Sequence, residues 1–169
     1  MEWKWADLKF GSDYGTRKED LDVIVKYLKE LNIKRMIELG TSTGLTAEYL
    51  TKEGDLDLFI TVDVSDVERI GRFIKDDRII QIKQDAVDFL KSLRKCKFDA
   101  IYIDDGHSYH TTLDQIKETC KLGIDLIFIH DLINIDVKRA VDDAIKSGLI
   151  EKIEETESAE RLGVYRRRR

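Results

Sequence analysis

The chain has 169 residues, of which none is proline, 37% are charged and 42% are hydrophobic. The lack of proline excludes polyproline linkers and collagen-like segments, and the hydrophobic fraction is sufficient for the core of one globular domain. The net charge is -5 although the last four residues are all arginine, so the rest of the chain is more acidic still. Such a body is poorly suited to bind nucleic acid, because phosphate binding depends on clustered lysine and arginine.

Neither end of the sequence carries a membrane signal. The N-terminus lacks the apolar run of a signal peptide, and no stretch approaches the roughly 18 apolar residues of a spanning helix. We therefore expect a cytoplasmic protein without a membrane partner. The arginines at 166–169 are expected to form a frayed, solubilising terminus, the alternative being a contact with phosphate or an acidic partner.

Short β-rich apolar runs alternate along the chain with segments of helical periodicity. In the first half, Thr16 and Glu19 form a capping box that predicts a helix up to about residue 31, and Ser65 with Glu68 forms a second one. Gly54 is the predicted end of another helix. The elements expected here are strands at 35–39, 58–62 and 79–82, and helices at 16–31, at 45–53, after Ser65, and at 86–93.

The second half continues the same alternation and then changes. We expect strands at 98–103 and 124–129 and helices at 108–121 and 137–145. The last two strands, 149–153 and 161–165, are expected to pair as an antiparallel hairpin. The whole pattern predicts a single doubly wound α/β domain whose seven-stranded sheet is mostly parallel, with helices on both faces.

Residues able to bind a ligand follow the first three predicted strands. Gly40 and Gly44 bracket a turn that leads into a helix N-terminus, Asp63 ends the second strand, and Asp85 follows the third. In a doubly wound sheet, ligands bind beyond the C-terminal ends of the strands. A carboxylate placed as Asp63 is can accept both ribose hydroxyls of an adenosine ligand. Asp85 is equally suited to cap the next helix.

The ends of the fourth and fifth strands carry carboxylates and imidazoles. Asp104, Asp105, His107 and His110 follow the fourth strand, and His130-Asp131 ends the fifth. These residue types serve as general bases, metal ligands and substrate anchors. The alternative is that Asp105 caps the next helix together with a serine, and that His110 is merely solvated. Since the two strands are expected to be neighbours, Asp104 and Asp131 should point at one volume and could hold a divalent cation.

Taken together, these motifs resemble those of class I S-adenosylmethionine-dependent methyltransferases. The resemblance is closest to the small O-methyltransferase-like group, which is methyltransferase family 24-like, and covers about residues 33–165. The matching segments are 37–44, 62–63, 84–86, 101–109 and 129–131. It implies a Rossmann-like fold in which residues 1–32 form an N-terminal arm and helix and residues 33–169 the methyltransferase domain.

The resemblance also implies roles for individual residues. Asp104 would lie beside the methyl sulfonium and His107 would face the acceptor, which makes either one the catalytic base. A divalent cation such as magnesium on Asp104 and Asp131 is an alternative way to activate the acceptor. Leu132 stands where metal-dependent relatives carry an asparagine or aspartate, which argues against the metal. The residues implied to bind the cofactor are Glu38, Gly40, Thr41, Ser42, Thr43, Gly44, Asp63, Val64, Asp85, Ala86 and Asp104.

The expected activity is O-methylation of a small-molecule or saccharide-like acceptor. Two other functions fit some of the motifs, namely an NAD-dependent oxidoreductase, which the glycine spacing argues against, and a non-catalytic S-adenosylmethionine-binding module. The aromatic residues near the N-terminus either form a lid or a homodimer contact, or pack the arm onto the sheet. These residues are Trp3, Trp5, Phe10 and Tyr14.

Overall fold

The computed structural model describes residues 16–65, 71–94 and 97–169. This part of the chain contains seven strands: β1 (Arg35–Leu39), β2 (Leu58–Asp63), β3 (Ile79–Lys83), β4 (Ala100–Ile103), β5 (Leu126–Ile129), β6 (Ile150–Glu155) and β7 (Gly163–Arg167). It also contains five helices: α1 (Lys18–Glu30), α2 (Leu45–Glu53), α3 (Ala86–Ser92), α4 (Tyr109–Leu122) and α5 (Ile135–Lys146). The helix expected after Ser65 includes residues 66–70 and so lies outside the described residues.

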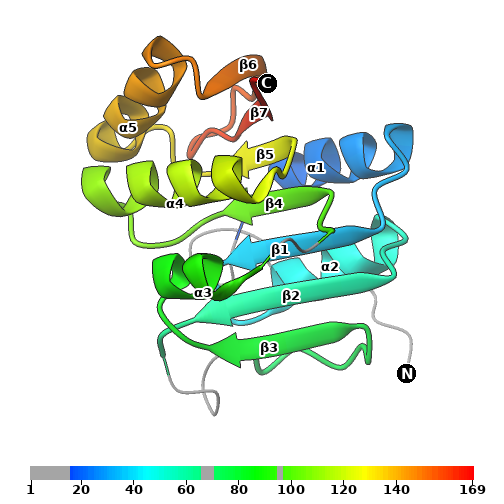
Figure 1. Ribbon diagram of the computed structural model, residues 1–169. Coiled ribbons are helices and arrows are strands. Elements are labelled where there is room, and N and C mark those ends of the chain that lie inside the picture. The colour runs from blue at the N-terminus through cyan, green and yellow to red at the C-terminus, as the bar shows by residue number, and fades with distance from the viewer. Residues whose placement is uncertain (1–15, 66–70, 95–96) are drawn as a thin grey trace.

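All seven strands form one sheet in the order β3-β2-β1-β4-β5-β7-β6 (Figure 1). The five strands from β3 to β5 are parallel, whereas β7 is antiparallel to both β5 and β6. The predicted doubly wound sheet with an antiparallel C-terminal hairpin is therefore confirmed. The strand order reverses between β1 and β4, which places the loops after these two strands at the topological switch point.

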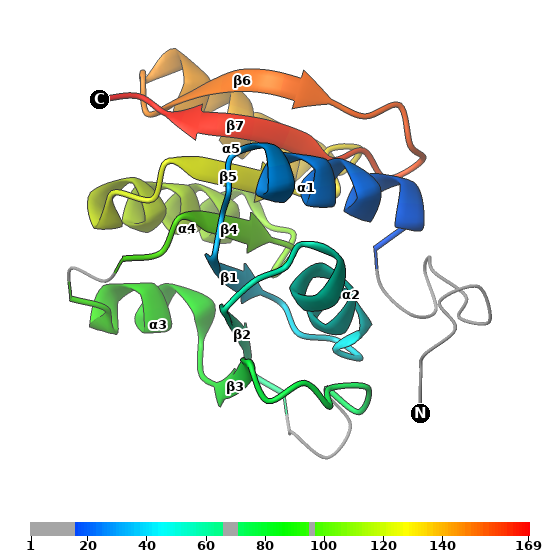
Figure 2. The same cartoon turned by 90° about the vertical axis from the view of Figure 1, so that its right-hand side faces the viewer.

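Helices cover both faces of the sheet, and each face has its own core (Figure 2). Helices α1 and α2 pack on one face, while α3, α4 and α5 pack on the other. Strand β5 contributes to both, since Leu126 and Phe128 belong to the first core and Ile127 and Ile129 to the second. Burial on both faces explains why the central strands are continuously apolar.

The capping box expected at the start of α1 is wrong. The N-cap is Arg17 and no side chain caps the helix. Thr16 Oγ1 instead lies 2.5 Å from the Tyr102 hydroxyl and donates to Asp104 Oδ2 at 3.3 Å. Thr16 is buried, so its hydroxyl must find a partner, and the tertiary contacts replace the local one. The N-terminus of α1 is thereby attached to the end of β4.

The C-terminal arginines are also ordered differently from the expectation. Strand β7 includes Arg166 and Arg167, and Arg167 forms an ion pair with Asp125 at 2.7 Å. Arg168 lies 3.6 Å from Glu151 of β6. The expectation of a frayed terminus is therefore wrong for Arg166 and Arg167, which belong to the sheet.

Two further expectations concern a membrane and the contacts of the N-terminal aromatic residues. Within the described segments, no helix is both long and apolar enough to cross a membrane. The expected contacts of Trp3, Trp5, Phe10 and Tyr14 lie outside the described residues.

Candidate active site

The ends of β1, β4 and β5 lie side by side, in register. Leu39 pairs with Ile103, which in turn pairs with Ile129. The backbone ladder continues by one step, since the Asp104 amide donates to the Leu39 carbonyl at 2.9 Å and the His130 amide to the Ile103 carbonyl at 3.0 Å. The polar residues that follow these strands therefore meet at one edge of the sheet.

The turn after β1 is tight and passes directly over the end of β4. Gly40 has a φ of 99°, and a Cβ atom placed there would lie 2.2 Å from the backbone oxygen of Asp104. Gly44 is the N-cap of α2 with a φ of 79°. Ser42, between them, has a φ of 46° and is exposed. Glycine at position 40 thus allows the turn to approach Asp104.

Asp63 at the end of β2 holds this turn in place. Its Oδ2 accepts hydrogen bonds from the amides of Thr41 at 3.1 Å and Ser42 at 3.3 Å, and its Oδ1 accepts from the Ser65 amide at 2.8 Å. The neighbouring Val64 is 59% exposed. A carboxylate has about four acceptor sites and three are used here, so Asp63 Oδ1 can accept one more hydrogen bond, from a ligand hydroxyl at an open surface.

Three other residues of the expected cofactor site are either buried or hydrogen-bonded within the protein. Glu38 is buried, accepts a hydrogen bond from Thr61 Oγ1 at 2.6 Å, and has its pKa raised by burial. It supports the turn from below, because Thr61 also contacts Thr41 Oγ1 at 2.7 Å. Asp85 is exposed and caps α3 by accepting from the Asp88 amide at 2.9 Å, and Ala86 beside it is buried.

Asp104, His107 and Asp131 form one cluster. His107 Nε2 makes an ion pair with Asp131 Oδ2 and lies 3.7 Å from Asp104 Oδ1. Hydrogen bonding to Asp104 and Asp131 raises the pKa of His107 to about 10. Burial would raise the pKa of Asp131, but His107 and His130 outweigh it and lower that pKa to about 2. At neutral pH the cluster is therefore an imidazolium between two carboxylates.

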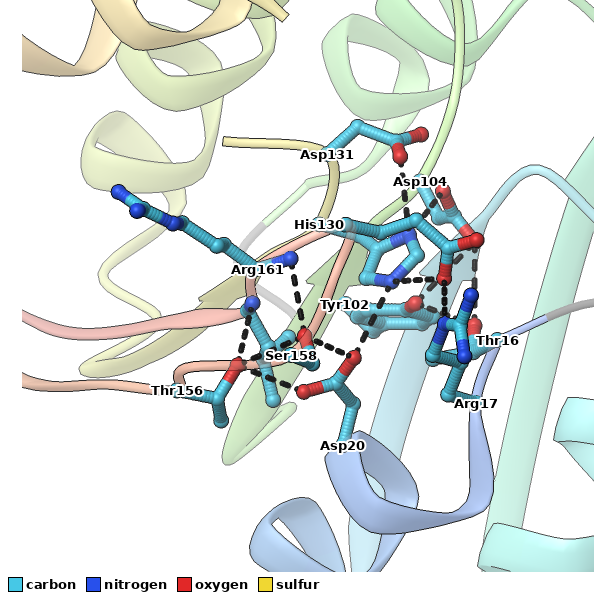
Figure 3. A network of polar contacts seen from close by, with 12 residues as sticks. Thr16, Arg17, Asp20, Tyr102, Asp104, His130, Asp131, Thr156, Ser158 and Arg161 are labelled. Atoms are coloured by element: carbon cyan, nitrogen blue, oxygen red, sulfur yellow. Dashed lines mark hydrogen bonds and ion pairs between the residues drawn. The ribbon is translucent and has the colours of Figure 1, made fainter. Parts of the chain in front are cut away.

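His130 lies behind this cluster and is itself surrounded by carboxylates (Figure 3). Its Nδ1 is 3.2 Å from Asp104 Oδ1, and the Tyr102 hydroxyl donates to Asp104 Oδ2 at 3.1 Å. Burial alone would raise the pKa of Asp104, but hydrogen bonds from the two histidines keep it well below its usual range. Burial would lower the pKa of His130, yet Asp104, Asp131 and Asp20 together raise it to about 12. Asp104 is therefore ionised and fixed in orientation.

A cavity of about 360 Å³ opens in front of these residues. Its lining comes from segments far apart in the sequence, namely the start of α1, the glycine turn, the ends of β4 and β5, and the segment between β6 and β7. The lining side chains are polar, which suits a ligand that donates hydrogen bonds. The residues concerned are Thr16, Ser42, Asp104, His107, His130, Asp131 and Glu160.

The structure brings together some of the expected residues and separates others. Potential ligand atoms of Asp104, His107 and Asp131 lie within 4.8 Å of one another, as expected for residues that point at one volume. Asp105 turns to Gln115, whose Nε2 donates to it at 3.0 Å, while Ser108 caps α4. His110 is exposed, in agreement with the solvated alternative.

Sequence reasoning missed Thr16, Asp20 and Glu160. Asp20 is fully buried, accepts hydrogen bonds from Thr156 and Ser158, and lies 3.6 Å from His130 Nε2. A signal was available, since Asp20 lies four residues before Ile24 and so is on the apolar face of its helix. Nothing local marks Glu160, which reaches the site because the Leu132 and Ile133 amides hold its loop through the carbonyls of residues 160 and 161.

The ion pair of His107 should make stability depend on pH. A histidine whose pKa is raised from 6.5 to about 10 on folding stabilises the fold fully below pH 6.5 and loses this effect as pH rises to about 10. We expect the difference in free energy of unfolding between the wild type and His107→Asn to be largest near pH 6 and to vanish near pH 10. Urea unfolding at pH 6, 8 and 10 measures it. The exposed His110→Asn serves as a control, and an equal difference at all three pH values would contradict the ion pair.

No protein-family model and no curated protein sequence matches the chain. Solved structures do match in fold. The SAH-bound methyltransferase PaMTH1 of Podospora anserina superposes with a TM-score of 0.77 at 15% identity, over 99% of this chain and 86% of that one. An O-methyltransferase from Bacillus cereus in complex with SAH superposes with a TM-score of 0.72 at 12% identity, over 93% of this chain and 84% of that one. The N-methyltransferase NodS from Bradyrhizobium japonicum WM9 superposes with a TM-score of 0.62 at 14% identity, over 90% of this chain and 97% of that one. The chain thus has the Rossmann-like fold of these methyltransferases, a fold that serves both oxygen and nitrogen acceptors.

Proposed function

We propose that the chain is a class I S-adenosylmethionine-dependent methyltransferase that methylates a hydroxyl group of a small-molecule or saccharide-like acceptor. The observation that carries this proposal is the glycine turn at the switch point, which is held by Asp63 and passes over Asp104. It occurs in a fold shared with methyltransferases bound to SAH. Assignment to the small O-methyltransferase-like, family 24-like group rests on the sequence motifs.

The residues present fit the cofactor. Gly40, where a Cβ atom would collide with the Asp104 backbone, brings the turn next to Asp104, and the exposed Ser42 lines the cavity in which the methionine part would lie. In this proposal the turn at 41–44 binds that part, Asp63 and Val64 bind the ribose, and Asp85 and Ala86 bind the adenine. Glu38 acts by supporting the turn. When bound, S-adenosylmethionine supplies an electrophilic methyl group.

Asp104 is the proposed base. It is ionised, oriented by Tyr102 and His130, and lines the cavity, so it can accept a hydrogen bond from an acceptor hydroxyl. Its lowered pKa makes it a weak base, so it takes up the proton as the bond between the acceptor oxygen and the methyl group forms, when that oxygen becomes strongly acidic. His107 holds its own proton in this arrangement and therefore orients the carboxylates rather than acting as the base. Magnesium on Asp104 and Asp131 would compete with this imidazolium for the same oxygens, which makes it a secondary proposal.

Three further expectations from the sequence are also part of the proposal. We propose a cytoplasmic location, a homodimer formed through the N-terminal arm, and the division into residues 1–32 and 33–169. An NAD-dependent oxidoreductase and a non-catalytic binding module are outcomes that the experiments below distinguish.

Asp63→Ala tests the cofactor site. Loss of the carboxylate removes the acceptor for the ribose hydroxyls, and hydrogen bonds to a charged group contribute about 1.5–3 kcal/mol each. We expect the dissociation constant for S-adenosylmethionine to rise about 10- to 100-fold, measured by calorimetric titration. Asp57→Ala, an exposed carboxylate at the other end of β2, should leave the affinity unchanged.

The same titrations distinguish the alternatives. Tight binding of NAD together with no binding of S-adenosylmethionine or S-adenosylhomocysteine would refute the methyltransferase. Binding of the adenosylated ligands, combined with no transfer of a labelled methyl group to any compound in a metabolite extract, would favour the non-catalytic module. A melting temperature of Asp63→Ala close to that of the wild type shows that the turn itself has survived.

A further inference from the structure

A second group of metal-binding side chains lies behind the proposed catalytic cluster. It consists of Asp20 from α1, His130 at the end of β5 and Glu160 from the segment between β6 and β7, whose potential ligand atoms lie within 4.8 Å of one another. We propose that Asp20, His130 and Glu160 bind a transition-metal dication of the Zn²⁺ type. This site is separate from the one considered at Asp104 and Asp131, and it does not depend on the proposed methyl transfer.

The first argument is an unsatisfied nitrogen. The His130 side chain is 5% exposed, and its buried Nε2 has no hydrogen-bond partner among the residues that the structure describes. Asp20 Oδ2 lies 3.6 Å and Glu160 Oε2 3.8 Å from it. These separations are too long for hydrogen bonds but are close to the roughly 3.4 Å between two ligands of a tetrahedral zinc ion. One potential ligand atom from each of the three residues lies within 4.8 Å of the other two.

The second argument is that the ligands are already oriented. His130 Nδ1 is 3.2 Å from Asp104 Oδ1, so a carboxylate holds the ring nitrogen opposite the proposed metal. This is the arrangement that commonly fixes the tautomer and orientation of a metal-bound histidine. Thr156 Oγ1 donates to Asp20 Oδ1 at 2.7 Å and Ser158 Oγ donates to Oδ2 at 2.8 Å. Asp20 is therefore held in place without using all the lone pairs of Oδ2.

The third argument is charge. Four carboxylates surround His130, at distances of 3.2–3.8 Å: those of Asp20, Asp104, Asp131 and Glu160. Arg17 also faces this group, with its Nε 3.2 Å from Glu160 Oε2. Its side chain is 43% exposed, so the guanidinium can turn to solvent when a cation takes the same oxygen. A dication would replace the proton that His130 loses on binding it and the charge of Arg17 that turns away, so the buried carboxylates would stay neutralised.

The donor set selects the type of metal. One imidazole with two carboxylates suits Zn²⁺ and Co²⁺, whereas Mg²⁺ prefers oxygen ligands alone and retains several waters. The 360 Å³ cavity is lined by both His130 and Glu160, which gives the ion a path of entry. The metal would join three segments that are distant in sequence and so fix α1 and the loop before β7 against the end of β5.

Cobalt titration of the full chain tests this site. The protein is stripped with a chelator, Co²⁺ is added while visible ligand-field absorption is recorded, and Zn²⁺ is added to displace it. We expect one Co²⁺ per chain, displaced by Zn²⁺, and an affinity that falls at least tenfold in Asp20→Asn and in Glu160→Gln. Glu157→Gln, an exposed carboxylate of the same loop, and Asp131→Asn should remain within about threefold of the wild type.

Separate controls test whether the variants fold and at which of the two clusters the metal binds. Far-ultraviolet circular dichroism and the melting temperature of the metal-free variants show whether each one folds, and Glu160→Gln carries the test if the buried Asp20→Asn does not fold. No binding of Co²⁺ or Zn²⁺ at 100 µM would overturn the proposal. Binding that survives Glu160→Gln but is lost in Asp131→Asn would overturn it too, by placing the metal at Asp104, His107 and Asp131. Titration of the metal-free protein with S-adenosylmethionine tests the proposed function independently of both outcomes.

Discussion

His130→Leu is expected to lower the free energy of unfolding of the metal-free protein by about 3–5 kcal/mol. Leucine fits a buried position but leaves the carboxylates of Asp20 and Asp104 without the cation that faces both. Removing one partner of a buried ion pair is costly because the other charge stays desolvated. Urea unfolding at pH 7, followed by circular dichroism, measures the loss.

Two comparisons separate this charge effect from packing. His107→Leu removes a histidine that is 45% exposed and should cost about 1 kcal/mol or less, since solvent screens its ion pairs. The double variant Asp20→Asn/His130→Leu should lose less stability than the two single variants added together, because neutral asparagine no longer needs the cation. A His130→Leu protein within 1 kcal/mol of the wild type would mean that the histidine does not balance these carboxylates.

Asp104→Asn is expected to reduce methyl transfer by about 10²- to 10⁴-fold at saturating cofactor. The amide keeps the shape of the side chain but cannot take a proton from the acceptor hydroxyl. Incorporation of a labelled methyl group into a metabolite extract, and later into the purified acceptor, measures the effect.

The controls for Asp104→Asn use its neighbour and the product of the reaction. Asp105→Asn changes an adjacent carboxylate that turns to Gln115, and it should keep activity within a few fold. S-adenosylhomocysteine has no sulfonium charge, so its affinity for Asp104→Asn should stay within about threefold of the wild type if the pocket is intact. Full activity of Asp104→Asn would remove the proposed base.

The sequence predicts the fold and the site residues that follow the parallel strands, and there is a physical reason for this. Alternating strands and helices give parallel strands, and in a parallel sheet all C-terminal strand ends lie at one edge. Gly40, Asp63 and Asp104 come directly after an apolar run and Asp131 one residue later, so their place at this edge can be read from local pattern alone. Their meeting in the structure needs no information about loops.

The other side of the site depends on contacts that no local pattern contains. Thr16 is well placed for a helix cap, and only the approach of β4 offers it Tyr102 and Asp104 instead. Glu160 reaches His130 because β7 pairs with β5 in the antiparallel direction, and the register of that pair is set by long-range packing. The charge states of the two histidines follow from these contacts, so the choice of Asp104 over His107 as base also required the structure.

The position of β7 has a consequence for folding during synthesis. This strand is made after β6 but lies inside the sheet, between β5 and β6. A chain in which β7 has not yet inserted therefore has an unpaired, apolar β5 edge, the kind of edge that recruits other chains. Its loop carrying Glu160 is not yet held against His130 either. A chain truncated just before Gly163 would thus be prone to aggregation, whereas insertion of β7 closes the sheet and places this loop at the site.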